Sequence, residues 1–407
     1  MTKKDIMRVA NDLGYGATKA SMDGEFIKQP SVVALVEQAE SDPVNHKNST
    51  DVKNVMDNIF GKMDVVIDKK RYLVGEAAQN STLDRTIFDT DSGKGKARTD
   101  LSRIITLSMI ATKAVKEAYD KGEDIFQPLK VSVAMTTALP ISEIGINLAG
   151  QPNVREEYAQ KFLSKNHIVI LKNFDYDISV NIEFKAVKVF KEGEIATVVA
   201  IKYGSKDVVN ALLADLKKYY PDRVDDGLTI IKKSKNTLGI DIGQGTTDLA
   251  LSTDGAADVY NSASIPLGYG TILKRATQFL PNMVPGLKVK DTIAFSKLLN
   301  SNPTNKIDKE NKEFALQAEK TSTSNLVNRI VQHVNTILTV SDHLEVIYIF
   351  GGGSIPIMER TELRQQLMNS VADHRSSAVV LWVGKDLAQN MNELGLKPMA
   401  DNMKIED

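Results

Sequence analysis

Apolar and polar residues alternate along the first half of the chain in blocks that predict both strands and helices. Residues 9–22 contain two strand-like runs joined by Gly14, Tyr15 and Gly16. Glycine takes the positive φ that a β-carbon disfavours, so we expect a hairpin here. Residues 129–140 are rich in apolar and β-branched side chains and end at a proline, which predicts a buried strand. Residues 167–190 predict two or three further strands.

Helical periodicity separates these strands. A stripe of apolar residues three or four positions apart begins at Leu101, and either Thr99 or Asp100 could cap the long helix that it predicts. The same spacing predicts helices over residues 153–163, from Asp207 onward, over residues 325–338 and over residues 358–371.

The second half of the chain repeats the start of the first. Residues 237–243 predict a strand, residues 246–255 its returning partner and residues 258–266 a third strand. Residues 344–354 predict a strand that runs into three glycines. Strands and helices intermix, so the fold class is α/β. Because both halves begin with an apolar run, an aspartate and a Gly-x-Gly turn, we interpret the chain as a duplicated domain with a cleft between the copies.

Length and composition agree with two globular domains. The chain has 407 residues, whereas one domain usually holds about 100–200. The contents of 42% hydrophobic and 25% charged residues are ordinary for globular proteins. Residues 36–97 are polar and uneven, and predict a small insertion with mobile loops. Its segment "SGKGKART" is not a P-loop, because the glycines and lysines stand at the wrong intervals.

Charge and residue usage exclude several classes of function. The formal net charge of −1 gives no electrostatic reason for direct binding to nucleic acid or to an acidic membrane. The absence of cysteine excludes disulfides and thiol nucleophiles, and the five histidines have no metal-ligand spacing. The N-terminus has no apolar signal region, and no stretch approaches the ~20 apolar residues of a membrane span. We therefore expect a soluble cytoplasmic protein.

Two aspartates are the first candidates for chemistry. Asp12 and Asp241 end apolar strands in front of glycine turns, and an unpaired buried carboxylate is costly. The turns present backbone N–H groups that bind anions. Each turn would thus place phosphate donors beside a carboxylate that repels phosphate. A divalent cation between the carboxylate and the phosphate removes this conflict, and Mg²⁺ takes one or two carboxylates plus phosphate oxygens. Two facing turns could clamp a nucleotide, although either turn alone also fits an ordinary hairpin.

A third glycine-rich segment follows a predicted strand. Residues 350–354 read Phe-Gly-Gly-Gly-Ser and precede a predicted helix. Glycines there would let a flat base lie against the backbone, and the N-terminus of the next helix favours negative charge. A plain strand-to-helix loop has the same pattern, and both interpretations stay open.

Five segments resemble, in order, the signature of the actin/Hsp70/sugar-kinase superfamily. "NDLGYGATKAS" and "GIDIGQGTTDLAL" resemble its two phosphate motifs, and "TTALPISEI" its first connecting motif. "IYIFGGGSIPIMERTEL" resembles the adenosine motif, and "DLAQNMNELGLK" the closing connecting motif, with Asn392 and Gly395 at the expected spacing. Within the superfamily, "ALPISE", "QPNVREEYAQKF" and "SIPLGYGTILKRA" resemble the bacterial plasmid-segregation actins, ParM and its relatives.

The resemblance implies an actin-like fold, in which two related domains with ribonuclease-H-like sheets and flanking helices surround a nucleotide cleft. The first domain would comprise residues 1–150 and 386–407, with an inserted subdomain at about residues 36–97. The second would comprise residues 151–385, with an inserted subdomain at about residues 272–323.

The resemblance also implies residue roles. Asp12 would hold Mg²⁺ through water, Asp241 would position Mg²⁺ or the attacking water, and Glu143 would orient or polarise that water. Without the resemblance, Glu143 fits equally a carboxylate in the first turn of a helix. Lys274 and Arg275 would reach the nucleotide, although a solvated helix face explains them as well. The remaining nucleotide-binding positions are Gly14, Tyr15, Gly16, Thr18, Gly243, Gln244, Gly245, Thr246, Thr247, Gly268, Gly351, Gly352, Gly353 and Ser354.

Two of these residues depart from the family pattern. Tyr15 stands where many relatives have a small or amide residue, and Gln244 replaces a common glycine, so base preference and hydrolysis rate stay open. The resemblance implies hydrolysis of ATP or GTP with Mg²⁺, self-assembly into filaments, and a DNA-bound adaptor that carries a plasmid. The alternatives are a metabolic kinase or phosphatase of the same superfamily, with Asp248 or Glu143 as base, and a cell-shape or phage filament.

Overall fold

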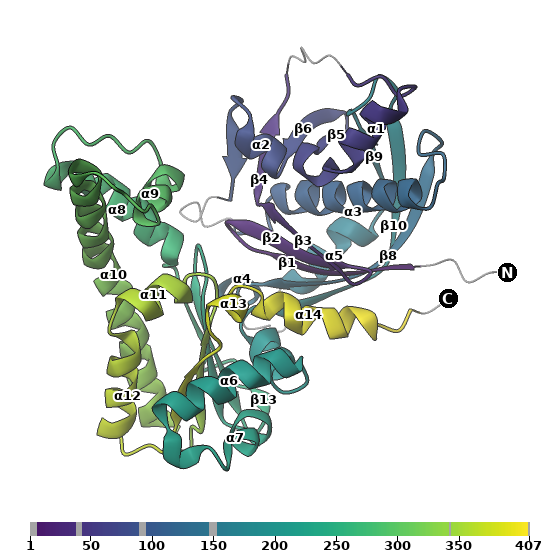
Figure 1. Cartoon of the computed structure of the whole chain (residues 1–407). Helices are drawn as coiled ribbons and strands as arrows, with labels where there is room; N and C mark the ends of the chain where they lie inside the picture. The colour runs from purple at the N-terminus through teal and green to yellow at the C-terminus, as the bar shows by residue number, and fades with distance from the viewer. Residues whose placement is uncertain (1–5, 38–42, 89–94, 146–152, 342, 406–407) are drawn as a thin grey trace. The chain divides into compact units, whose positions relative to one another are not determined.

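The computed structural model describes residues 6–37, 43–88, 95–145, 153–341 and 343–405 (Figure 1). The chain forms two compact units. Unit 1 comprises Met1–Leu139, Glu143–Lys191 and Glu393–Asp407, and unit 2 comprises Pro140–Ser142 and Glu192–Asn392. The fold class is α/β, as the sequence predicts, with one mixed sheet in each unit.

Unit 1 is built on a ten-stranded sheet in the order β3-β2-β1-β8-β10-β9-β5-β6-β4-β7. The predicted hairpin is confirmed, because β1 and β2 pair antiparallel, and β8 and β10 continue the sheet in parallel. β8 lies between two neighbours and is buried over most of its length, which explains its lack of alternation. The strands are β1 (Ile6–Leu13), β2 (Ala17–Met22), β3 (Glu25–Pro30), β4 (Val32–Leu35), β5 (Asp64–Ile67), β6 (Lys70–Val74), β7 (Arg85–Ile87), β8 (Leu129–Leu139), β9 (His167–Leu171) and β10 (Ile178–Lys191).

Helices of unit 1 cover this sheet. The helix predicted from Leu101 is α3, and many of its apolar side chains join one core with β1, β8 and the strands of the insertion. α5 is capped by Asn153, whose side chain accepts from the Arg155 N–H at 3.1 Å. The helices are α1 (Ser49–Met56), α2 (Glu76–Asn80), α3 (Leu101–Asp120), α5 (Val154–Leu163) and α14 (Met391–Asp401), and the short α4 (Ile141–Ile144) contains a crossing point between the units.

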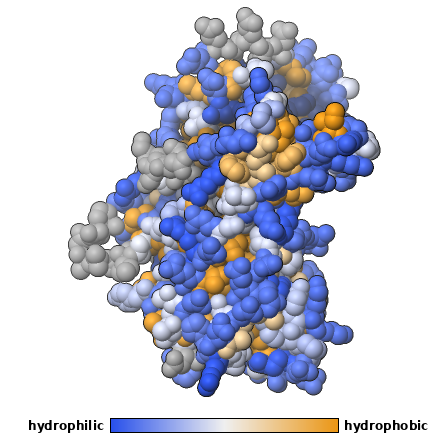
Figure 2. Space-filling view, turned by 90° about the vertical axis from the view of Figure 1, so that its left-hand side faces the viewer, coloured by the Kyte–Doolittle hydropathy of each residue, from blue (hydrophilic) through white to orange (hydrophobic). Residues whose placement is uncertain are grey.

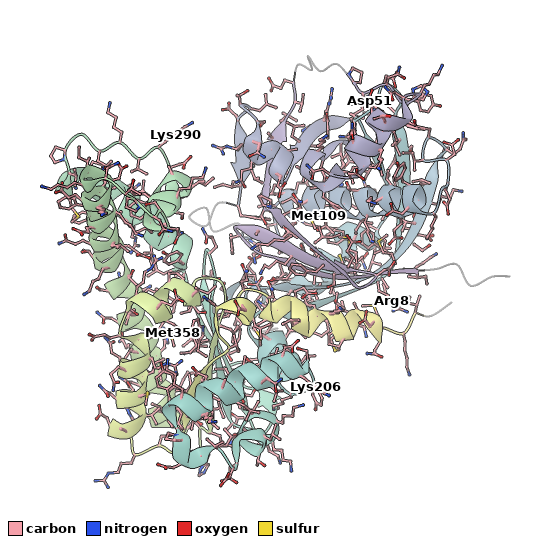
Figure 3. The ribbon with its side chains drawn as sticks, in the orientation of Figure 1. Arg8, Asp51, Met109, Lys206, Lys290 and Met358 are labelled. Atoms are coloured by element: carbon pink, nitrogen blue, oxygen red, sulfur yellow. The ribbon has the colours of Figure 1, made fainter. Side chains whose placement is uncertain are left out.

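Hydrogen bonds from β1 and β8 hold the C-terminal helix α14 and the residues that follow it. Arg8 Nη1 donates to the carbonyl oxygens of Ala400 at 3.1 Å and Met403 at 2.6 Å (Figure 3). Thr136 Oγ1 donates to Leu396 O at 3.0 Å from the buried strand β8. The closing segment of the chain therefore belongs to the unit that the N-terminal strand begins.

The boundary between the units differs from the sequence expectation. Residues 151–191, which we expected in the second domain, belong to unit 1, whereas residues 140–142 and 386–392, which we expected in the first domain, belong to unit 2. The reason is strand pairing: β10 runs parallel to β8 along its whole length, and β9 returns antiparallel to β10. The insertion expected at residues 36–97 also joins this sheet, because β5 pairs with β9. Its residues 38–42 and 89–94 lie outside the described part of the chain.

Unit 2 repeats the strand pattern of unit 1. Its sheet has the order β13-β12-β11-β15-β16, with β14 also paired to β12. In both units an antiparallel pair that ends at a glycine turn, β1–β2 or β11–β12, is followed by two parallel strands. This shared topology confirms the predicted duplication. The strands are β11 (Thr237–Ile242), β12 (Thr247–Thr253), β13 (Ala256–Ala257), β14 (Ala263–Ile265), β15 (Val346–Phe350) and β16 (Val379–Trp382).

The helices of unit 2 pack around two separate cores. One core lies at the sheet, and a smaller one is formed between α8, α9 and the first half of α10. The smaller core overlaps the subdomain expected at residues 272–323, and α10 carries the chain from it to the sheet. The helices are α6 (Lys206–Tyr219), α7 (Gly227–Lys233), α8 (Tyr269–Met283), α9 (Thr292–Leu299), α10 (Lys306–Val340), α11 (Ser354–Arg360), α12 (Leu363–Asp373) and α13 (Lys385–Ala388), with a π-helical turn at Ala196–Ile201.

Two predicted helices have other limits than the sequence indicates. The helix predicted over residues 325–338 is the second half of α10, which begins at Lys306 behind the capping residue Asn305. The helix predicted over residues 358–371 is divided into α11 and α12. Thr361 has an extended backbone, and its hydroxyl accepts from the Leu363 N–H at 3.2 Å, so it ends one helix and starts the next.

Polar side chains predominate on the face that Figure 2 shows, with apolar side chains scattered between them. None of the helices among the described residues has the length and apolar content needed to cross a membrane.

Candidate nucleotide site

The turn between β1 and β2, residues 14–17 (the first glycine turn), is closed by its own backbone. The Gly14 N–H donates to Ala17 O at 3.1 Å, and a β-carbon on Gly14 would lie 2.6 Å from that oxygen. Gly14 is therefore required by close approach. Because its N–H is used inside the turn, the exposed Gly16 is the better placed donor for an external anion.

Asp12 ends β1 with an ion pair. Its carboxylate is 2% exposed, and Lys19 stands directly opposite on β2. Lys19 Nζ lies 2.5 Å from Asp12 Oδ2. The sequence analysis missed Lys19, although counting the hairpin register back through the turn would have found it. The cost of burying the Asp12 carboxylate is thus offset by a cation of the protein itself.

Thr18 braces the first glycine turn from inside. Its side chain is fully buried, and its hydroxyl lies 3.0 Å from Ser31 Oγ. Ser31 Oγ in turn donates to Gly14 O at 2.7 Å. Thr18, a predicted nucleotide contact, is therefore part of the support for the turn.

Glu143 lies in α4 and is held within unit 1 by three donors. The backbone N–H groups of Lys96 and Ala97 donate to its carboxylate at 2.9 and 2.8 Å. The Tyr15 hydroxyl, from the first glycine turn, donates to Glu143 Oε1 at 3.2 Å. The structure thus brings the two predicted residues Tyr15 and Glu143 together, and adds the segment around Lys96.

A further buried carboxyl stands near Asp12. Glu393, at the start of α14, is 2% exposed and accepts a hydrogen bond from Ser21 Oγ. Burial raises the pKa of Glu393, and the negative charge of Asp12 adds to the rise.

This raised pKa predicts a pH effect on stability. A carboxyl whose pKa is higher in the folded state contributes stability below its ordinary pKa of about 4.3, and loses it as pH rises through the raised value. We expect Glu393→Gln, which keeps an acceptor for Ser21, to remove this loss. Urea unfolding followed by circular dichroism from pH 4 to 8 should show the variant gaining on the wild type as pH rises. The exposed Glu123→Gln is the control, and parallel curves for Glu393→Gln and wild type would contradict the assignment.

The turn between β11 and β12, residues 243–246 (the second glycine turn), is built like the first. The Gly243 N–H donates to Thr246 O at 2.9 Å. The N–H groups of Tyr269 and Gly270, at the start of α8, donate to Gly243 O and Gln244 O at 2.9 and 2.8 Å. The backbone N–H groups of Gln244 and Gly245, which we predicted to bind phosphate, take no part in these three hydrogen bonds.

Glycines let α8 approach the second glycine turn. A β-carbon on Gly268 would lie 2.7 Å from Gly243 O, and one on Gly270 would lie 2.5 Å from Gln244 Nε2. Thr247 is fully buried, and its hydroxyl donates to Leu267 O at 2.9 Å. Gly268 and Thr247, both predicted to bind the nucleotide, therefore fix the turn in place.

Asp241 faces a second carboxylate in unit 2. Asp241 and Asp248 are register partners on β11 and β12, and both are buried. Asn392 Nδ2 donates to Asp241 Oδ2 at 2.7 Å, and Asn392 Oδ1 accepts from the Gly193 N–H at 3.1 Å. Asn392, which the resemblance marked only by its spacing, is thus a direct partner of Asp241.

Asp248 is held within unit 2 through both of its carboxylate oxygens. Its Oδ1 accepts from the Ile141 N–H at 3.2 Å, and its Oδ2 accepts from Thr246 Oγ1 at 3.0 Å. Like charges directly opposite on a sheet are destabilising, and a hard cation with oxygen ligands would relieve the repulsion. Among the described residues no group of three or more histidine, cysteine or acidic side chains is arranged to hold a metal ion. Asp241 and Asp248 could supply two carboxylates, and Mg²⁺ takes one or two carboxylates beside phosphate oxygens.

The three glycines after β15, residues 351–353, serve different purposes. A β-carbon on Gly351, which has φ +88, would lie 2.4 Å from Ile242 O, and Gly353 donates its N–H to the same oxygen at 2.8 Å, so both glycines lie against the end of β11. Gly352 is exposed and is the glycine available to a flat ligand. Ser354 is fully buried, and its hydroxyl accepts from Trp382 Nε1 at 3.1 Å.

Tyr269 connects the second glycine turn to the helices of unit 2. Its hydroxyl donates to Glu319 of α10, and Arg360 of α11 holds the same carboxylate at 2.8 Å. Burial, together with the Glu319 charge, raises the pKa of Tyr269, so the hydroxyl stays protonated and donates. Lys274 and Arg275 lie on the exposed side of α8.

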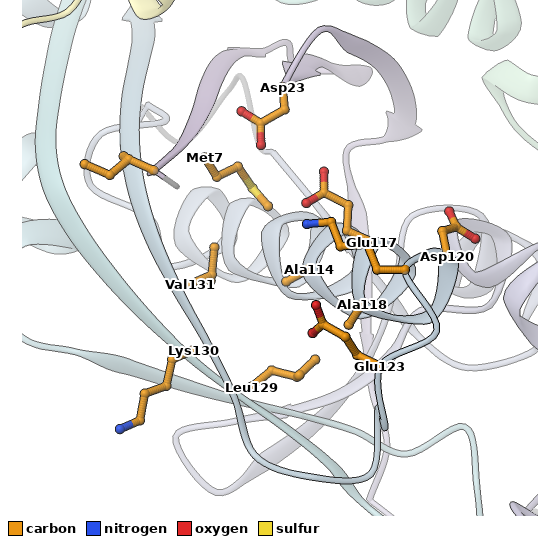
Figure 4. A pocket seen from close by; sticks show the side chains of 12 residues that line it. Met7, Asp23, Ala114, Glu117, Ala118, Asp120, Glu123, Leu129, Lys130 and Val131 are labelled. Carbon is orange, nitrogen blue, oxygen red and sulfur yellow. The ribbon is translucent and has the colours of Figure 1, made fainter. Parts of the chain in front are cut away.

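A pocket of unit 1 lies away from the glycine turn (Figure 4). It is lined by the first residues of β1 and β8 and by the C-terminal end of α3, so it is at the opposite end of β1 from Asp12. Four carboxylates, from Asp23, Glu117, Asp120 and Glu123, line it. They would repel phosphate, and this pocket is not part of the candidate site.

Comparison with known proteins places this architecture. Residues 10–194 match the family model described as the N-terminal domain of actin-like proteins. No curated protein sequence matches the chain. Among solved structures, the actin-like protein Alp7A has a TM-score of 0.67 at 17% identity, over 97% of this chain and 96% of that one.

Two further structures resemble the chain over nearly its whole length. The Bacillus thuringiensis ParM with AMPPNP has a TM-score of 0.53 at 14% identity, over 98% of this chain and 99% of that one. An archaeal actin homologue in complex with ADP has a TM-score of 0.58 at 17% identity, over 98% and 100%. Residues 10–194 therefore match the N-terminal domain family of actin-like proteins, and the chain has the actin-like fold over nearly its whole length.

Proposed function

We propose that the protein binds ATP with Mg²⁺, hydrolyses it, assembles into filaments, and drives plasmid segregation together with a DNA-bound adaptor. The observation that carries the proposal is the aspartate–glycine turn that ends the corresponding strand pair in each sheet. Solved structures of the same fold support it, because a ParM was solved with ADP and with AMPPNP.

In this proposal the two turns bind phosphate through different groups. The first glycine turn contributes the backbone N–H groups of Tyr15 and Gly16 and, behind them, the Lys19 ammonium paired to Asp12. The second contributes those of Gln244, Gly245 and Thr246, and its carboxylate pair, Asp241 and Asp248, supplies oxygen ligands. When bound, Mg²⁺ would neutralise phosphate charge during transfer of the terminal phosphoryl group.

The remaining predicted residues take supporting roles. Glu143 orients the attacking water, because a phosphoryl group leaving in a loose transition state needs positioning more than covalent help. In the proposal the base and ribose lie at the exposed Gly352, and Lys274 and Arg275 reach the ribose from the exposed side of α8. Gly14, Gly243, Gly268, Gly351 and Gly353 allow the close backbone approaches on which the turns depend.

Asp248 weighs against the alternative of a metabolic kinase. Such an enzyme needs a base that is free to take a proton from a second substrate. Both oxygens of the Asp248 carboxylate already accept hydrogen bonds within unit 2. We therefore assign Asp248 to the phosphate side of the site.

The proposal predicts nucleotide-dependent assembly. We expect ATP with Mg²⁺ to produce light scattering above a critical protein concentration, with phosphate release that follows assembly. If GTP and not ATP produces the scattering, the proposed nucleotide is wrong but the proposed filament stands. Protein that binds nucleotide but stays monomeric in sedimentation would contradict the filament, and turnover stimulated by a small sugar or acid would favour the kinase.

The adaptor requires its own experiment. We expect a small DNA-binding protein encoded beside this gene, once bound to its DNA repeats, to lower the critical concentration or to slow filament disassembly. A filament that is indifferent to such a complex would favour the cell-shape or phage alternatives. Electron microscopy of the same samples distinguishes bundled filaments from amorphous aggregates.

A further inference from the structure

A short turn in unit 1 binds the Glu143 carboxylate through backbone N–H groups. Gly95, Lys96 and Ala97 (the 95–97 turn) belong to the segment "SGKGKART", which has glycine spacing unlike a P-loop. Gly95 has φ +62, and the next two N–H groups point at one acceptor group, the Glu143 carboxylate. Successive N–H groups after such a residue form a concave anion site.

Tyr15 completes the set of donors and is itself fixed from two sides. Its ring meets Phe88 edge-on at 5.8 Å, and the Lys96 ammonium stands 4.6 Å from the ring centre. Lys96 is 1% exposed, so this contact is desolvated. The Tyr15 hydroxyl is thereby directed to Glu143 Oε1.

We infer that the 95–97 turn and Tyr15 position Glu143 for its water-orienting role, an inference that rests on the proposed nucleotide hydrolysis. An ionised carboxylate accepts about four hydrogen bonds. Among the described residues, Oε1 accepts from Lys96 N–H and the Tyr15 hydroxyl, and Oε2 accepts from Ala97 N–H. Oε2 thus accepts fewer of these bonds than Oε1, and in the proposed reaction it is the oxygen that would meet the water.

Tyr15, the 95–97 turn and Glu143 come from three separate segments, and their hydrogen bonds form only if all three are correctly placed. A side chain on residue 95 would reach the carboxylate, because a β-carbon there would lie 2.6 Å from Glu143 Oε2. The obstructed group is the end of a flexible side chain, so the expected response is a displaced carboxylate in a folded protein. The positioning residues are Tyr15 and the 95–97 turn, and Glu143 is the residue that touches the water.

Gly95→Ala is the test, and Gly122→Ala is its matched control. Gly122 has φ +75 in the same unit but nothing within 4 Å of an added β-carbon, so it shares the backbone strain alone. We expect Gly95→Ala to lower kcat by up to about 100-fold, the scale of a group misplaced by about 1 Å, with KM unchanged. Nucleotide affinity, read from Trp382 fluorescence, should also be unchanged. Gly122→Ala should keep the wild-type kcat.

Tyr15→Phe keeps the inference testable if Gly95→Ala folds poorly, and a double variant tests whether Gly95 acts through Glu143. Tyr15→Phe retains the ring and removes one donor, and we expect a smaller loss of kcat in the same direction. In a Glu143→Gln background, Gly95→Ala should cause no additional loss, because both changes act through one carboxylate. An additive loss, or an effect on KM alone, would overturn the inference.

An observation independent of turnover separates this inference from the proposed function. If wild-type protein hydrolyses no nucleotide, the proposed function fails, but the hydrogen bonds can still be examined. In protein labelled with [¹⁵N]alanine, Glu143→Ala should shift the Ala97 amide resonance, whereas Gly122→Ala should leave it in place. An Ala97 resonance that ignores Glu143→Ala would show that the 95–97 turn does not hold this side chain.

Discussion

Asp241→Asn is expected to lower nucleotide hydrolysis by about 100-fold, the scale of removing one preorganised electrostatic group from a transition state. The change removes the charge but keeps the size and an oxygen acceptor for Asn392. Because Asp241 and Asp248 are like charges in register, the nucleotide-free variant should be at least as stable as the wild type. Phosphate release and urea unfolding, measured on the same preparation, check both parts.

Slower hydrolysis together with unchanged or higher stability would show that the Asp241 charge serves function and not folding. Asp207→Asn, at an exposed position of α6 in the same unit, is the control for removal of an aspartate. Asn392→Ala should cause a smaller loss of hydrolysis, because it loosens Asp241 without removing the carboxylate. Wild-type turnover in Asp241→Asn would refute the assignment of Asp241, and a strongly destabilised variant would mean that its carboxylate is structural.

Gly351→Ala is expected to destabilise unit 2 by about 2–5 kcal/mol. A positive φ costs a side chain about 1–2 kcal/mol, and forcing atoms into a packed site adds about 1–3 kcal/mol. Gly351 has φ +88, and an added β-carbon would overlap Asp241 Oδ1 and lie 2.7 Å from the carbonyl carbon of Ile242. The Asp241 side chain could move, but the Ile242 carbonyl is backbone, so a rotamer change cannot relieve the whole obstruction.

Trp382 makes this prediction measurable in one unit. It is the single tryptophan of the chain, lies at the end of β16 and donates to Ser354, three residues after Gly351. Its fluorescence during urea unfolding should report the loss. Gly384→Ala is the control, because Gly384 has φ +79 with nothing within 4 Å, so about 1–2 kcal/mol of strain is expected there. Equal midpoints for the two variants would contradict the close approach at Gly351.

The two glycine turns are copies that have acquired different chemistry. The residue opposite the aspartate is a lysine in unit 1 and a second aspartate in unit 2. A cation beside the first turn suits phosphate, and a carboxylate pair beside the second suits a metal ion. In the proposed site Asp241 is therefore better placed than Asp12 to ligate Mg²⁺, because the Asp12 carboxylate already pairs with Lys19.

The sequence by itself determined the features that depend on neighbours in the chain. The two hairpins follow from apolar runs on either side of a glycine turn, and both are confirmed. The α/β class and the duplication follow from the order of such elements. The start of α3 at Leu101 follows from apolar spacing, which depends only on residues three and four apart.

Only the tertiary structure decided the contacts between distant segments. Periodicity cannot tell which strands pair, and it is the pairing of β10 with β8 that puts residues 151–191 in unit 1 and not in the second domain. Asn392 reaches Asp241 across 151 positions, and Lys96 reaches Glu143 across 47. These bonds arise because packing brings the ends of several strands together, and no local pattern in the sequence records which donors will meet a given carboxylate.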